Sequence, residues 1–307
     1  MTIPSTPRWS SSMLRRDLGA RALSLASARG LLHDISPGAS PVVIFGRDEH
    51  GHHGNFHPAA YATICAHPEW VRRLAKVHTA SRRSRARKDW RWMELDSANS
   101  SDALLMNIFC HPGVFDGAAF AAPVASLLNI DPATQPCFGA RPGVPFRRGR
   151  LDRTEIDLVL GDLFLEAKLT EHDFQTAAPS LIERYRDLEA VFDVARLPRK
   201  LVAPPPLPPN LDPDDPTVNL PTRPAKLRIL GYQLIRNVLA AFASDASFCV
   251  LSDARRRDLI DLWYAVLSAV HAPGFAWRLK LLTWQELAAA LPRDLQQFLE
   301  AKYGICP

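Results

Sequence analysis

Residues 154–169 read TEIDLVLGDLFLEAKL, two runs of alternating character on either side of Gly161-Asp162. Two turn residues that begin with glycine are typical of a type II′ β-hairpin. With these residues at the turn, Leu160 faces Leu163 and the pairing continues outward from there. The stretch therefore predicts a tight antiparallel hairpin.

The predicted hairpin gathers its charged side chains on one face. Alternation along each strand puts four of them there, with Asp157 opposite Glu166 and Glu155 opposite Lys168. The opposite face points toward the core and carries Ile156, Leu158, Leu160, Leu163, Leu165, Ala167 and Leu169. An ordinary solvated face with a Glu155–Lys168 ion pair is the alternative interpretation.

Facing carboxylates destabilise a sheet, and a divalent cation between them reverses that effect. Mg²⁺ and Mn²⁺ take hard oxygen ligands, usually one or two carboxylates together with water and substrate phosphate. The ammonium of Lys168, two residues from Glu166, could then hold an attacking water or balance charge on a phosphate. Asp157, Glu166 and Lys168, with Glu155 beside them, thus predict metal-assisted phosphodiester hydrolysis.

Strands and helices alternate after the hairpin, which is typical of an α/β sandwich. The patterns predict helices over residues 180–197, where Ser180 and Glu183 form a capping box, 227–242 and 255–270, then two short helices ending near residue 303. They predict strands over 247–251 and 275–282. Residues 198–224 carry ten prolines, which predicts an exposed insertion.

The part of the chain before the hairpin is expected to be mostly helical. Helices are predicted over residues 13–32, 61–77 and 102–110, the second divided by Pro68, with a short strand over 41–45. Residues 132–150 are predicted to form a loop that ends in a basic stretch.

The overall composition is that of a soluble globular protein. The chain has 307 residues, of which 47% are hydrophobic and 22% charged, with a net charge of +5. No run approaches the ~18 apolar residues that cross a bilayer, so we expect no membrane partner. Five scattered cysteines without CxxC spacing favour a reducing compartment, and we expect a cytoplasmic protein.

The charge is divided unevenly along the chain. Residues 1–150 hold 19 Lys/Arg against 11 Asp/Glu, and residues 151–307 hold 18 against 21. A basic half joined to clustered carboxylates suits an anionic polymer held beside a cation-binding site.

The spacing Asp157-x8-Glu166-Ala167-Lys168 resembles the D…(D/E)-x-K signature of the PD-(D/E)XK nuclease superfamily, although Ile156 stands where the name of the family has proline. The resemblance continues in RTEIDLVLGDLFLEAKLTEHDF, ERYRDLEAVF, GYQLIRNVLAAF and TWQELAAAL…FLEAKYGI. Together these segments look like a bacterial restriction-endonuclease-like family over about residues 95–305, apart from the proline-rich insertion.

The resemblance implies a restriction-endonuclease-like fold, with a mixed central sheet flanked by helices. We expect a basic, mostly helical region over residues 1–94 and a nuclease-like domain over 95–307 with the insertion at 198–225. It further implies that the carbonyl of Ala167 joins Asp157 and Glu166 as a metal ligand. Gln233 would approach the site, with Arg236 one turn on. Asp102 and Glu94 are weaker candidates for an added acidic residue.

Four arginines, at positions 147, 148, 150 and 153, lead directly into the first strand of the hairpin. Because guanidinium groups match phosphate geometry, we expect Arg147, Arg148, Arg150 and Arg153 to contact DNA, with a solvated loop as the alternative. A second basic run, residues 82–92, ends with Trp90 and Trp92 and could clamp a backbone and stack bases, or form a solvated face.

The sequence therefore predicts a Mg²⁺- or Mn²⁺-dependent nuclease acting on DNA. A homodimer is one expected arrangement, since many restriction-type nucleases act as dimers. The alternative is a catalytically silent nucleic-acid-binding module of a defence or repair assembly, and a weaker one is a carboxylate-pair glycosidase. His50, His52, His53 and His57 suggest zinc at first sight, but their spacing fits no standard finger.

Overall fold

The hairpin lies at the centre of the computed structural model, which describes residues 9–36, 41–77, 93–203 and 224–307. Strand β6 (Ile156–Leu160) pairs antiparallel with β7 (Leu163–Ala167), and Leu160 faces Leu163 as predicted. Gly161 has a φ of +61°, while Asp162 is not in the positive-φ region. That combination is what a type II′ turn requires, so the predicted turn and the register of the three pairs next to it are confirmed. The pairing ends at Leu158 and Leu165 and does not include the predicted pairs of Asp157 with Glu166 and of Glu155 with Lys168.

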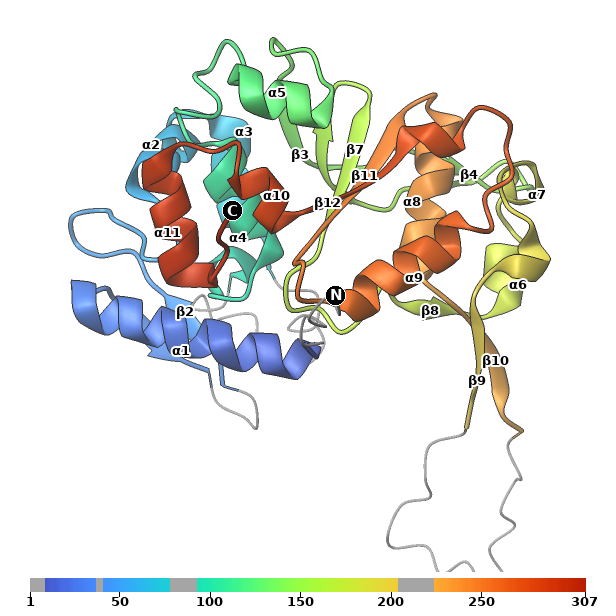
Figure 1. Cartoon of the computed structure of the whole chain (residues 1–307), viewed down its shortest axis with the longest axis horizontal. Helices are drawn as coiled ribbons and strands as arrows, with labels where there is room; N and C mark the ends of the chain where they lie inside the picture. Colours follow the sequence, from blue (N-terminus) through green and yellow to red (C-terminus); the bar gives the residue numbers. More distant parts are fainter. Residues whose placement is uncertain (1–8, 37–40, 78–92, 204–223) are drawn as a thin grey trace, which may run out of the picture.

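A mixed five-stranded sheet is built around the hairpin in the order β12-β11-β7-β6-β3. Strand β11 (Ser247–Ser252) runs parallel to both β7 and β12 (Leu279–Thr283). Strand β3 (Pro136–Ala140) pairs antiparallel with β6 at one edge. Figure 1 shows helices on both sides of this sheet, which confirms the predicted fold class.

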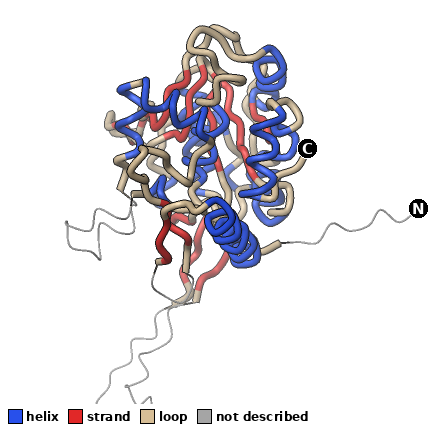
Figure 2. Tube along the Cα trace, turned by 90° about the vertical axis from the view of Figure 1, so that its left-hand side faces the viewer, coloured by secondary structure: helices blue, strands red, loops and turns tan. Residues whose placement is uncertain are grey.

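Each face of the sheet is covered by its own group of helices (Figures 1 and 2). Helices α4 (Ser101–Phe109), α10 (Trp284–Ala288) and α11 (Arg293–Tyr303) cover one face, and α8 (Tyr232–Ala243) and α9 (Arg257–Leu267) cover the other. Because β7 is central, all five of its residues are buried. Within the described ranges, every helix is too short or too polar to cross a bilayer.

The two faces of the hairpin follow the predicted alternation with one exception. Leu158 and Leu165 pack into the core on the α4 side, while Phe164 packs into the core on the α8 side. Ile156 was expected beside Leu158, but it packs on the α8 side. Glu155 and Ile156 therefore leave the regular alternation where β6 begins, which matters for Glu155 below.

The N-terminal region contains α1 (Ser11–Arg29), β1 (His33–Ile35), β2 (Val43–Phe45), α2 (Pro58–Ala66), α3 (Pro68–Leu74) and the 3-10 turn η2 (Glu94–Asp96). The predicted division at Pro68 is confirmed, since α2 ends and α3 begins there. Leu14, Leu18 and Trp70 share a hydrophobic core with Leu158. The N-terminal helices are thus packed on the sheet, and the boundary at residues 94–95 stays a prediction.

The helix predicted over residues 180–197 is wrong. The chain forms two short helices, α6 (Pro179–Ile182) and α7 (Leu188–Val191), and the 3-10 turn η3 (Val194–Arg196). Between them the backbone pairs with the hairpin of β4 (Val144–Pro145) and β5 (Leu151–Asp152), through Arg147 N–H to Arg184 O at 2.8 Å and Arg186 N–H to Pro145 O at 2.9 Å. Tertiary pairing overrides the helical pattern here.

Other elements also differ from the prediction, and the strand predicted over 275–282 begins only at Leu279. Strands β3 and β4 lie in the segment expected to be a loop. Residues 226–230 form β10 (Lys226–Leu230), which pairs with β9 (Arg199–Val202) and β8 (Thr176–Ala177), so α8 begins only after Gly231. Gly231 has a φ of +69°, which ends the strand and turns the chain into α8. Helix α5 (Ala122–Leu128) and the 3-10 turn η4 (Ala276–Arg278) complete the described elements.

A buried lysine joins the N-terminal region to the last helix. Lys302 of α11 is 1% exposed, and its Nζ donates to the carbonyl of Asn55 at 2.6 Å and to the Tyr303 hydroxyl at 3.1 Å. Burial lowers the pKa of this amine well below its ordinary value. No carboxylate of the described residues pairs with Lys302 to offset that desolvation.

The buried amine predicts a pH dependence of stability. Between its lowered folded pKa and an unfolded value of about 10.4, the unfolded chain binds more protons, so stability rises with pH by up to ~1.4 kcal/mol per unit. Replacing Lys302 with Met should remove this contribution. We expect chemical denaturation to show that the free energy of unfolding of the wild type rises relative to that of Lys302→Met between pH 7 and pH 10. Two proteins whose free energies of unfolding change in parallel with pH would contradict this prediction.

Candidate active site

Glu166 is the central group of the site and is fully buried at the end of β7. Its Oε1 accepts a hydrogen bond from Lys168 Nζ at 2.7 Å and another from the amide of Gln233. Its Oε2 accepts from Asn237 Nδ2 at 2.7 Å. Three donors therefore fix both oxygens of one buried carboxylate, which determines the direction of its remaining lone pairs.

Asp157 lies beside Glu166 at the start of β6 and is partly buried. Its Oδ2 accepts a hydrogen bond from the backbone N–H of Ala167 at 2.9 Å. Burial, and then the charges of Glu166 and Asp102, raise the pKa of Asp157 well above its ordinary value. No Lys or Arg among the described residues forms an ion pair with Asp157, and the charge of Lys168 only partly offsets the effects that raise the Asp157 pKa.

Lys168 is 6% exposed and is held through both its backbone and its side chain. Its N–H donates to Leu251 O at 2.8 Å, and its carbonyl accepts from Trp284 Nε1 at 2.9 Å. Burial alone would lower the pKa of the amine, but the charges of Glu166, Glu171 and Asp157 raise it above its ordinary value. Lys168 therefore carries a proton at neutral pH.

Helix α8 supplies the amides that orient Glu166. Gln233 and Asn237 are one turn apart, so both side chains reach the same carboxylate. The structure thus brings Gln233 to the site as expected, together with Asn237. Arg236 is 7% exposed, lies over the ring of Tyr232 at 5.4 Å, and its Nε has no hydrogen-bond partner in the described ranges. A nucleic-acid contact by Arg236 stays a prediction.

Glu155 does not pair with Lys168, and the expected cross-strand ion pair is wrong. It precedes β6, and its Oε1 lies 2.6 Å from Arg73 Nη1 and 3.0 Å from Lys76 Nζ, while Oε2 lies 3.2 Å from Arg141. Burial works against ionisation, but the charges of Arg73 and then Lys76 lower the pKa of Glu155 to about 2. Two of these three partners, Arg73 and Lys76, are cations from the N-terminal region, and a catalytic role for Glu155 stays a prediction.

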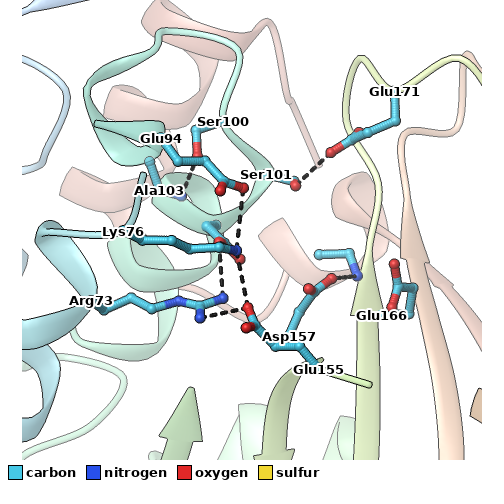
Figure 3. Close-up of polar contacts among 12 residues, drawn as sticks. Arg73, Lys76, Glu94, Ser100, Ser101, Ala103, Glu155, Asp157, Glu166 and Glu171 are labelled. Atoms are coloured by element: carbon cyan, nitrogen blue, oxygen red, sulfur yellow. Dashed lines mark hydrogen bonds and ion pairs between the residues drawn. The ribbon is translucent and has the colours of Figure 1, made fainter. Parts of the chain in front are cut away.

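The cations Arg73 and Lys76, drawn in Figure 3, also contact Asp102, one of the weaker acidic candidates. Asp102 is 4% exposed near the start of α4, and its Oδ2 lies 2.9 Å from Arg73 Nη2 and 2.6 Å from Lys76 Nζ. Lys76 also lies 3.2 Å from Glu94 Oε1. Sequence reasoning missed Arg73 and Lys76, because they lie 82 and 79 positions before Glu155 and no local pattern links them.

The donors at this site fit a small divalent cation. Asp157, Glu166 and the carbonyl of Ala167 offer the hard oxygen ligands that Mg²⁺ and Mn²⁺ prefer. Burial, and then the charges of Glu166 and Asp102, raise the pKa of Asp157, and a bound cation would offset the repulsion from these neighbouring carboxylates. Glu171 is held by Ser101 Oγ at 2.7 Å and by Leu169 N–H at 2.6 Å, so it lines the site next to Lys168 without contacting Glu166.

The four arginines before the hairpin are exposed. Arg147 is already engaged, since it forms an ion pair with Glu189 and donates to Glu183 O at 2.8 Å. Arg148, Arg150 and Arg153 form no ion pair with the described residues. They remain available to an anionic partner, whereas the basic run with Trp90 and Trp92 falls outside the described residues.

The histidines do not gather at one metal site. His52 lies by Asp48, His53 by Asp96 and His57 by Asp294. His57 meets His111 and Asp294 in a cluster whose ligand atoms lie within 4.8 Å of one another. However, Nδ1 of His111 accepts an N–H from Gly113 at 3.0 Å, and Nδ1 of His57 accepts one from Ala59 at 3.3 Å.

These acceptor roles fix the tautomers of His57 and His111. A neutral imidazole that accepts at Nδ1 carries its proton on Nε2, the atom that faces Asp294 in both rings. Nε2 could not then bind an ion without a change of tautomer. The cluster is accordingly a hydrogen bond between His111 and Asp294, with Nε2 of His57 3.8 Å from the same carboxylate oxygen, and the acidic site of the hairpin is the better metal candidate.

Comparison with known families gives one match. A family model described as Restriction Endonuclease associating with ARP matches residues 26–304. The match includes the hairpin, α8 and most of the N-terminal region. No curated protein and no solved structure matches the chain.

The raised pKa of Asp157 predicts a stabilising substitution. Asp157→Asn keeps an acceptor for Ala167 N–H and removes the repulsion from Glu166, so the metal-free protein should gain about 1 kcal/mol of unfolding free energy. Thermal melting in EDTA at pH 7 measures this gain. Asp162→Asn, in the exposed turn of the same hairpin, is the matched control and should melt like the wild type. A variant Asp157→Asn that melts lower would contradict the prediction.

Proposed function

The chain belongs to this restriction-endonuclease family, and we propose that it is a Mg²⁺- or Mn²⁺-dependent nuclease that hydrolyses phosphodiester bonds in DNA. The observation that carries the proposal is the group of the partly buried Asp157 and the buried Glu166 and Lys168 at one end of the hairpin. Two carboxylates stand beside a protonated amine, and one of them, Asp157, forms no ion pair with the described residues. This combination suits an ion and a phosphate better than it suits a solvated surface.

Asp157, Glu166 and the Ala167 carbonyl would hold the ion, which would supply Lewis-acid activation of water and of the phosphate. The amides of Gln233 and Asn237 keep Glu166 in one orientation, so its free lone pairs need no reorganisation. Ala167 takes part through its backbone: its N–H donates to Asp157, and its carbonyl would be the third ligand of the ion.

Lys168 acts in this proposal as a cation rather than as a general base. Its raised pKa keeps the amine protonated, so it can orient water through its N–H groups and balance the charge that develops on the phosphate. The backbone contacts with Leu251 and Trp284 hold Lys168 in register with the end of β11. A general base would need a pKa near the working pH, which this environment does not give.

The exposed Arg148, Arg150 and Arg153 supply positive charge ahead of the site. They come directly before Glu155 and Asp157 in the chain, so a duplex held by them would lie near the acidic group. Such phosphate contacts give affinity without sequence readout. DNA as the polymer and a homodimeric assembly are both part of the proposal.

Loss of the ammonium tests the proposed chemistry. Lys168→Ala and Lys168→Met should each lower the Mg²⁺-dependent nicking rate of plasmid DNA by at least ~10²-fold, the usual effect of removing one charge-stabilising donor. The reaction should stop in EDTA for all proteins.

Lys200→Ala is the control, because Lys200 is exposed on β9, and it should cut like the wild type. Circular dichroism and melting temperatures confirm that each variant is folded. A wild type that binds DNA in EDTA and never cuts it with Mg²⁺ or Mn²⁺ would point to a silent binding module. Cleavage that survives both Lys168 variants would remove this residue from the chemistry.

The arginines give a separate prediction on DNA binding. A triple variant with Ala at positions 148, 150 and 153 should bind DNA more weakly in EDTA. The slope of log affinity against log salt concentration should fall by about 0.9 for each phosphate that the variant no longer neutralises. Arg147→Ala should have a smaller effect, because Glu189 already neutralises that guanidinium. Fluorescence anisotropy over a range of salt concentrations measures both. An unchanged slope in the triple variant would mean that DNA does not contact these three arginines.

A further inference from the structure

Two cations from α3 and the residues after it enter the acidic group beside Asp157. Arg73 belongs to α3, and Lys76 follows two residues after the helix ends at Leu74. Both approach the same two oxygens: Asp102 Oδ2 lies 2.9 Å from Arg73 and 2.6 Å from Lys76, and Glu155 Oε1 lies 2.6 Å and 3.0 Å from them. One oxygen from each of two carboxylates is thus shared by two fixed cations.

We propose that Arg73 and Lys76 take the place of a second divalent ion, so that this site binds one metal ion and not two. The inference rests on the proposed nuclease function and specifies its metal content. In two-metal nuclease sites, carboxylates bring a pair of ions to about 3.5–4 Å from each other. Here the carboxylates that could hold the further ion, Asp102 and Glu155, are already bridged by protein cations.

The two halves of the acidic group are close enough to influence each other. The charge of Asp102 raises the pKa of Asp157, and the charge of Asp157 in turn raises the pKa of Arg73. Figure 3 shows Arg73 and Lys76 reaching toward Glu155 from the side opposite Glu166. An ion held by Asp157 would therefore have Arg73 and Lys76 as its neighbours. These two cations occupy the side of the acidic group where a second ion would otherwise bind.

The balance of charge supports one ion. Five carboxylates and four cations of the described residues form the group, which leaves one negative charge for a divalent ion to neutralise: Asp102, Glu155, Asp157, Glu166 and Glu171 against Arg73, Lys76, Arg141 and Lys168. A second ion would add two further positive charges to a largely buried place, which is unfavourable. Without Arg73 and Lys76, three negative charges would remain, more than one divalent ion can neutralise.

The side chains in this bridge are restricted, so they cannot easily move aside for an ion. The side chain of Arg73 is 10% exposed and that of Asp102 is 5% exposed. A guanidinium does not lose its proton in a protein, and the raised pKa of Lys76, which the charge of Asp102 sustains against burial, keeps that amine charged as well. The positive charge on this side of the site is therefore permanent at working pH.

The test counts ions without relying on cleavage. Full-length wild-type protein is titrated with Mn²⁺ in the absence of DNA, by calorimetry and by electron paramagnetic resonance of free Mn²⁺. We expect one ion per chain. The variant Arg73→Gln/Lys76→Gln should bind two, and its low-temperature spectrum should show the exchange coupling of two neighbouring Mn²⁺ ions, which the wild type lacks.

Arg72→Gln is the control, because Arg72 is exposed on the same helix and should leave the count at one. A wild type that binds two coupled ions overturns the inference and leaves the proposed nuclease intact. A folded double variant that still binds one ion also overturns it. A wild type that binds no Mn²⁺ overturns the proposed metal-dependent function itself. If the double variant does not fold, the wild-type count alone decides.

Discussion

A fully buried carboxylate, Glu166, is the constraint on which the rest of the site depends. An ionised group in the interior costs several kcal/mol unless its charge and lone pairs are matched. Lys168 supplies the charge, and the amides of Gln233 and Asn237 supply the remaining donors. The position of α8 against β7 is therefore set by chemistry as well as by packing. An apolar α8 would leave Glu166 without donors on that side, and the strand could not keep an acid there.

Asp157 is the group that this network leaves unbalanced. One peptide N–H holds it, and its neighbours Glu166 and Asp102 oppose its ionisation. A chain that only bound nucleic acid would be more stable with an amide or an apolar residue at this position. Active sites, in contrast, commonly retain unfavourable charges of this kind at the expense of stability. A divalent cation would offset the repulsion between these carboxylates. This is the physical reason for proposing a metal-dependent enzyme rather than a silent module with the same fold.

The sequence predicted what local rules determine. The turn at Gly161 fixes the register of β6 and β7, and period-two alternation then assigns Asp157 and Glu166 to one face. The division of α2 and α3 at Pro68 and most of the helices in the C-terminal half follow from equally local patterns. Gln233 could be expected near the site only through family resemblance, because the strand β10 that sets the start of α8 was not anticipated.

What the sequence could not show are contacts between distant segments. The backbone around Tyr185 pairs with the β4–β5 hairpin instead of continuing a helix, and Glu155 pairs with Arg73 and Lys76 instead of Lys168. In both places a long-range partner outweighs a local pattern worth about 1 kcal/mol or less. The candidate active site consequently draws its residues from two segments. The hairpin supplies the candidate metal ligands. The cations of α3 and of the residues after it determine how much further positive charge these ligands can bind, so neither segment alone determines the proposed chemistry.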